Sequence, residues 1–121
     1  MPEGREFYKK VTDPELKILS KLLCERLFSA REAKDKASML QVLKDLMQDE
    51  VVHFHYEKVS GEMRTAFGTR LPEIISRHGG DPKGEGREGS LKTFAYFDIV
   101  RRAWRSFRPE SIVDIDRDYV I

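Results

Sequence analysis

The chain has a single cysteine, no long apolar run and almost no net charge. One cysteine, Cys24, excludes an internal disulfide framework, and its place among leucines predicts a small buried residue rather than a reactive thiol. Crossing a bilayer takes roughly 20 consecutive apolar residues, which this sequence does not contain. The polar residues 1–10 show no apolar signal core. We therefore expect a cytoplasmic protein with no membrane partner.

A recognisable catalytic arrangement is also missing. The sequence shows no Ser/His/Asp order in a known context, no activated cysteine and no carboxylate pair tied to a cleft-forming element. His53 and His55 lie two apart on an expected strand and point the same way, but two ligands are too few for a metal, and His78 falls in a glycine-rich loop. We therefore predict a protein that is not an enzyme, with no catalytic residues, no metal site and no cofactor.

What the chain does have is a local concentration of arginine. The net charge of +1 argues against a molecule that is basic all over. Four arginines nevertheless fall within residues 101–108, and a local basic patch is enough to collect phosphate.

The first half of the chain has the pattern of helices. An oxygen of Thr12 or Asp13 can accept from the amides of a first turn, so we expect a helix over about 14–29. The polar residues 31–36 either continue this helix or interrupt it, and the apolar stripe of residues 39–47 predicts a second helix. The apolar positions of the first helix are Leu16, Leu19, Leu22, Leu23, Cys24, Leu27 and Phe28.

The second half alternates apolar and polar residues, as short β-strands do. Ser60-Gly61 has the composition of a tight hairpin, and residues 71–75 suggest a short turn. Residues 76–91 contain five glycines and predict a long flexible loop. The expected strands are 51–59, 62–69, 92–99, 103–108 and a short run that begins at Ile112.

These elements predict an α+β protein. Five short strands cannot bury both faces as a flat sheet, so we expect them to close into an SH3-like or Sm-like small β-barrel with a helix over one end. Residues 1–36 would form an N-terminal helical extension, and residues 37–121 the small barrel with its leading helix.

The arginines are interleaved with aromatic residues in the expected third and fourth strands. Guanidinium groups clamp phosphate, and aromatic faces stack on bases. This combination predicts a rim that binds an anionic ligand, either nucleic acid or a nucleotide. The alternative is a purely structural role, in which Arg105 pairs with Asp98 or Glu110 and the aromatic rings only pack. The predicted ligand-binding residues are Arg64, Tyr96, Arg101, Arg102, Trp104, Arg105 and Arg108.

The strand pair VVHFHYEKVSGEMRTAFGT, the following LPEII and the segment FAYFDIVRRAWRSFRPESIVDI resemble the small SH3-barrel relatives of the WYL domain, found in bacteria and their phages. The likeness covers roughly residues 45–116 and is best over 104–112. The family's Trp-Tyr-Leu signature reads Ala95-Tyr96-Phe97 here, and Ser111 replaces an arginine. The resemblance implies a regulatory domain that senses a ligand, and some such domains bind nucleic acid or nucleotides.

A function of another class is an interaction or assembly module. In that case the apolar stripe of the first helix docks on a copy of the chain, as a homo-oligomer, or on another protein. The stripe consists of Leu16, Leu19, Leu23 and Leu27.

Overall fold

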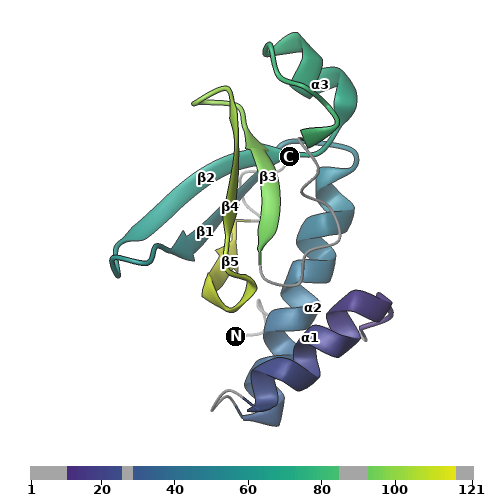
Figure 1. Ribbon diagram of the computed structural model, residues 1–121, viewed down its shortest axis with the longest axis vertical. Coiled ribbons are helices and arrows are strands. Elements are labelled where there is room, and N and C mark those ends of the chain that lie inside the picture. The colour runs from purple at the N-terminus through teal and green to yellow at the C-terminus, as the bar shows by residue number, and fades with distance from the viewer. Residues whose placement is uncertain (1–10, 26–28, 85–92, 117–121) are drawn as a thin grey trace.

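The computed structural model describes residues 11–25, 29–84 and 93–116 and has an α+β architecture. Figure 1 shows α2 along one side of the sheet, α1 across the first half of α2, and α3 beyond one end of the sheet. The elements are α1 (Pro14–Glu25), α2 (Ala30–Met47), β1 (Val52–Glu57), β2 (Met63–Thr69), α3 (Pro72–Arg77), β3 (Phe94–Asp98), β4 (Ala103–Phe107), the 3₁₀ turn η3 (Pro109–Ser111) and β5 (Ile112–Ile115).

Asp13 caps the first helix. Its side chain accepts from the amide of Glu15 at 2.9 Å, while Thr12 bonds to Gln41 of α2. Leucines three and four positions apart turn one face of α1 towards the core. Cys24 follows the buried Leu23 and is exposed, so its predicted burial is wrong. One helical residue corresponds to about 100°, which carries this side chain away from the buried face.

The second helix is continuous through the polar run that the sequence left undecided. Ser29 and Glu32 form a complete capping box, in which each side chain accepts from the other residue's backbone amide. The cap fixes where α2 begins, and residues 31–36 form its more solvated first turns. The helix passes without a break through the predicted boundary at residues 36–37.

The predicted hairpin between the first two strands is confirmed. β1 and β2 pair antiparallel from Val52 opposite Gly68 to Glu57 opposite Met63. Gly61 sits in the turn at φ +96°, a conformation that glycine adopts without steric cost. In Figure 1 this hairpin extends away from the helices.

The sheet is open rather than closed into the predicted barrel. Its strand order is β4-β3-β2-β1-β5, so β4 and β5 are its two edges among the described residues. Helices take the place of closure: α2 packs on the apolar inner face, α1 packs on α2, and a single buried cluster extends from Leu16 to Ile115. Because helices cover this face, the strands have no need to curl onto themselves.

A second, smaller packing layer covers the outer face of β3 and β4. Phe97 of β3 and Trp104 of β4 meet edge to face, with ring centroids 5.9 Å apart. A side chain at Gly80 would clash with the Phe97 ring, so the chain after α3 passes tightly over this face. The predicted turn at 71–75 is the start of α3, and the first part of the predicted loop is packed. Residues 85–92 of that loop lie outside the described residues.

The leucine stripe of the first helix is buried within its own chain. Leu16, Leu19 and Leu23 are at most 7% exposed, while Leu27 lies outside the described residues. These three leucines are therefore not the exposed surface on which the assembly prediction depends. A homo-oligomer stays a prediction.

In the described part of the chain, the helices are too short or too polar to cross a membrane.

Candidate functional site

Arg64 is at the centre of the basic residues that the fold brings together. It lies on β2 opposite Tyr56 of β1, and opposite residues of an antiparallel pair share a face. Arg105 lies opposite Tyr96 by the same rule. The hydroxyl groups of these two tyrosines are 2.8 Å apart. The two arginines thus lie on the inner face of the sheet, where the core ends and solvent begins.

The gap beside Arg64 exists because β2 leaves its neighbour early. β2 and β3 pair only through Gly68 with Asp98 and Thr69 with Phe97, followed by a bond from the amide of Ile99 to Phe67. The outer part of the β1–β2 hairpin therefore diverges from β3 and β4. Arg64 lies on this diverging part and faces into the gap.

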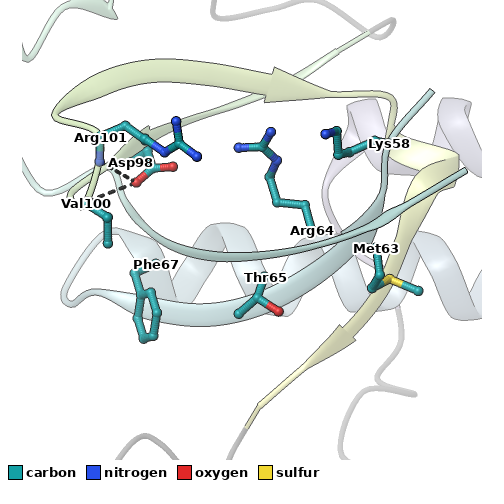
Figure 2. A pocket seen from close by; sticks show the side chains of 8 residues that line it. All are labelled: Lys58, Met63, Arg64, Thr65, Phe67, Asp98, Val100 and Arg101. Carbon is teal, nitrogen blue, oxygen red and sulfur yellow. Dashed lines mark hydrogen bonds between the residues drawn. The ribbon is translucent and has the colours of Figure 1, made fainter. Parts of the chain in front are cut away.

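One cavity on this gap has a volume of about 360 Å³ and is lined by three cationic side chains. Figure 2 shows Arg101, Arg64 and Lys58 on the same side of β2, with their charged ends towards one another. Met63, Thr65 and Phe67 project on the other side of that strand. The remaining lining residues are Asp98 and Val100.

A second cavity, of about 500 Å³, adjoins the first and shares Lys58 and Arg64 with it. Arg105 and Arg108 of the last strands add two guanidinium groups. We call the two cavities together the basic cleft. Its cationic residues are Lys58, Arg64, Arg101, Arg105 and Arg108.

Asp98 organises the β3–β4 side of the cleft. Its side chain is buried, and one carboxylate oxygen accepts from the amides of Val100 and Arg101 at 2.9 and 3.0 Å. The other oxygen lies 3.4 Å from Nε of Arg105. The alternative in which Arg105 pairs with Asp98 is therefore confirmed. This pairing orients the guanidinium group and neutralises part of its charge.

Not all the cationic groups of the cleft are neutralised in this way. Lys58 lies 3.4 Å from Glu62 across the hairpin turn. Within the described ranges, no carboxylate lies within ion-pair distance of Arg64, Arg101 or Arg108. Three guanidinium groups around one cleft thus keep their charge available for a ligand.

Three of the predicted site residues lie elsewhere. Tyr96 is completely buried, and burial followed by its bond to Tyr56 raises the pKa of its hydroxyl. Arg102 lies exposed in the β3–β4 turn at φ +56° and lines neither cavity. Trp104 lies on the opposite face of β4 from Arg105, and its indole NH donates to the carbonyl of Asp81 at 2.8 Å.

The predicted rim of indole and guanidinium groups in one place is therefore wrong. Alternation in β4 sends Trp104 and Arg105 to opposite faces, and the indole ring packs on Phe97 and Gly84. Arginines from separate strands gather instead. Lys58 was missed because the prediction was built on arginines and aromatic residues, whereas Lys58 is a single lysine directly after β1.

Comparison with known proteins identifies the fold family. A family model described as "WYL_2, Sm-like SH3 beta-barrel fold" matches residues 40–113, which is more than half of the chain. The match begins within α2 and ends within β5, so it takes in β1 to β4, the start of β5 and the basic cleft. No curated protein and no solved structure matches the chain. The chain belongs to the WYL_2 family of Sm-like SH3 folds.

Proposed function

We propose that this protein is a non-enzymatic regulatory domain that binds a phosphate-bearing ligand, a nucleic acid or a nucleotide, in the basic cleft. The observation that carries the proposal is the position of Arg64. It lines both cavities, with Arg101 in one and Arg105 and Arg108 in the other. Guanidinium groups bind phosphate through two parallel hydrogen bonds, and several of them converge here.

The shape of the cleft favours a short single strand of nucleic acid over a single nucleotide. Two open cavities that share a wall can take successive phosphates of one backbone, whereas a mononucleotide fills only one. Trp104 and Tyr96 contribute no stacking surface to the cleft, because one packs on the outer face and the other is buried. Recognition through phosphate alone tolerates many sequences.

The regulatory part of the proposal rests on the WYL family membership. The non-enzymatic part rests on the sequence, which offers no recognisable nucleophile with a base.

The test is binding of a labelled single-stranded oligonucleotide, measured by fluorescence anisotropy over a range of salt concentrations. We expect Arg64→Ala to weaken binding by roughly 10-fold, because a charged hydrogen bond is worth about 1.5–3 kcal/mol. The negative slope of the logarithm of the association constant against the logarithm of the salt concentration should become shallower by about 0.7 for each lost phosphate contact to a single strand. Arg101→Ala should act in the same direction.

Arg102→Ala is the matched control. It removes the same charge from the same turn as Arg101, but it lies outside both cavities. Equal losses in Arg102→Ala and Arg64→Ala would mean that the cleft has no special part in binding. Competition with inorganic phosphate and with a mononucleotide separates a simple anion site from a strand-binding one. Lack of binding even at low salt would overturn the proposal.

A further inference from the structure

A second cluster of polar side chains lies on the outer face of β1, on the opposite face of the sheet from Arg64 and Arg105 of the basic cleft. His53 and His55 both project from this face, because residues two apart on a strand share a side. Phe54 of β1 pairs with Ile115 of β5, and the amide of Asp116 then donates to the carbonyl of His53 at 2.8 Å. The end of β5 thus brings a carboxylate beside the two imidazoles.

We propose that His53, His55 and Asp116 form a binding site for a divalent transition metal of the Zn²⁺ type. One ligand atom from each residue lies within 4.8 Å of the other two. His53 Nδ1 and Asp116 Oδ2 are 3.0 Å apart. Two atoms bound to one zinc ion at about 2.1 Å can be at most about 4.2 Å apart, so small side-chain rotations suffice. Two imidazoles and one carboxylate are a common three-ligand set for zinc, which leaves a fourth position for water.

Neighbouring side chains hold both imidazole rings in place. His55 Nδ1 lies 3.0 Å from the hydroxyl oxygen of Thr65, and in the tautomer in which Nδ1 donates this bond the Nε2 lone pair is left for a metal. The Phe67 ring stacks on His53 with centroids 4.4 Å apart and an interplanar angle of 3°. Ligands that are oriented in advance lose less freedom when a metal binds.

The sequence alone did not reveal this site, because its third ligand is distant in the chain. The histidine pair by itself is too small a ligand set. Asp116 is brought beside it only by the pairing of β5 with β1. A bound metal would join β1 to the end of the neighbouring edge strand, β5.

The competing explanation is an ordinary ion pair between protonated His53 and Asp116, whose side chains are 14% and 34% exposed. The two explanations differ in whether His55 is needed. An ion pair does not require it, whereas a metal site loses one ligand of three without it.

The experiment is a titration of the untagged full chain with Zn²⁺ against a chromophoric chelator, in a Cys24→Ser background that removes the exposed thiol. We expect one Zn²⁺ per chain. His53→Gln, His55→Gln and Asp116→Asn should each weaken binding at least 10-fold, because each removes one ligand. With Zn²⁺ at about 100 times its Kd, the melting temperature should rise by roughly 5 °C or more.

Two matched controls come from the same chain. His78→Gln removes the histidine of the described residues that lies outside the cluster, beyond α3. Asp114→Asn changes a carboxylate opposite His55 whose oxygen accepts from the Ile115 amide. Both should leave Zn²⁺ affinity unchanged. Absence of stoichiometric Zn²⁺ binding, or equal affinity in the His55→Gln protein, would overturn the site. Circular dichroism of each variant shows whether a lost affinity reflects misfolding.

Discussion

The hydroxyl groups of Tyr56 and Tyr96 are paired inside the core at the edge of the basic cleft. They lie 2.8 Å apart, and both side chains are at most 4% exposed. One hydroxyl donates to the other, so each has a hydrogen-bond partner at this buried position. Burial is the main cause that raises the pKa of Tyr96, so this residue stays neutral throughout the physiological range.

Tyr96→Phe should lower the free energy of unfolding by about 1–3 kcal/mol, because it leaves the buried Tyr56 hydroxyl without a partner. The double variant Tyr56→Phe/Tyr96→Phe should lose less than the sum of the two single losses, since no orphaned hydroxyl is left. Urea denaturation of the four proteins measures this coupling. Additive losses would show that the hydroxyl pair contributes nothing beyond packing.

At the residue level, alternation predicted the face of the sheet on which a side chain lies better than it predicted which residues that side chain contacts. It correctly divides β1 into a buried face with Phe54 and an outer face with His53. It could not show that the segment after α3 covers Trp104, because that contact joins residues distant in the chain. It also could not show that Arg64 faces Arg105 and Arg108 across a cleft.

Among the elements, α1 is fastened to α2 at its first turn. The carboxylate of Asp13 accepts from the ammonium group of Lys44 at 2.8 Å as well as from the Glu15 amide. Gln41 of α2 accepts from the amides of Thr12 and Asp13. The bond from Lys44 is the largest cause that lowers the pKa of Asp13 below its ordinary value of 3.8.

Asp13→Asn should remove this charge while keeping a good helix cap, because asparagine caps about as well as aspartate. The pKa of Asp13 is lower in the folded chain, so the unfolded chain takes up the proton first as the pH falls. Wild type should therefore be more stable than the variant near pH 7, by less than about 1 kcal/mol for a pair partly open to solvent.

That advantage should disappear as the pH falls from about 4 through the folded pKa of Asp13. Urea unfolding of both proteins between pH 7 and pH 2.5 measures the difference. Asp45→Asn, an exposed carboxylate on α2, is the control and should show no such trend. A difference that is independent of pH would mean that the charge of Asp13 is not what joins the helices.

The elements themselves were largely predictable, whereas sheet closure was not. Helix periodicity, the Ser60-Gly61 turn and strand alternation located the start of the first helix, the end of the second helix and all five strands to within a few residues. The start of α2 at Ala30 was not located, because the apolar stripe that predicts this helix begins only at residue 39. These signals are local. Whether β4 meets β5 depends on how much of the inner face the helices cover, and no local pattern records that. The sequence predicts only a turn at α3, because this helix is too short to show a helical period.

For the molecule as a whole, one buried cluster joins the N-terminal helix to the last strand. Leu16 and Leu23 of α1 belong to the same cluster as Phe54 of β1 and Ile115 of β5. The WYL_2 match begins at residue 40, so α1 lies outside the matched region and still contributes to the core. We therefore expect the helices and the sheet to unfold as one cooperative unit.

Leu23→Ala tests this expectation, because Leu23 is fully buried at the helix interface. Truncation should lower the free energy of unfolding by about 2–5 kcal/mol, whereas Leu22→Ala, at a neighbouring position that is 36% exposed, should cost less than about 1 kcal/mol. The single tryptophan, Trp104, lies on the outer face of the sheet, so its fluorescence reports on the side of the sheet opposite the apolar inner face. In Leu23→Ala, the unfolding transitions followed by this fluorescence and by far-ultraviolet circular dichroism should move together to lower denaturant concentration. If only the helical signal moved, α1 would be a separate unit that rests on an independently stable sheet.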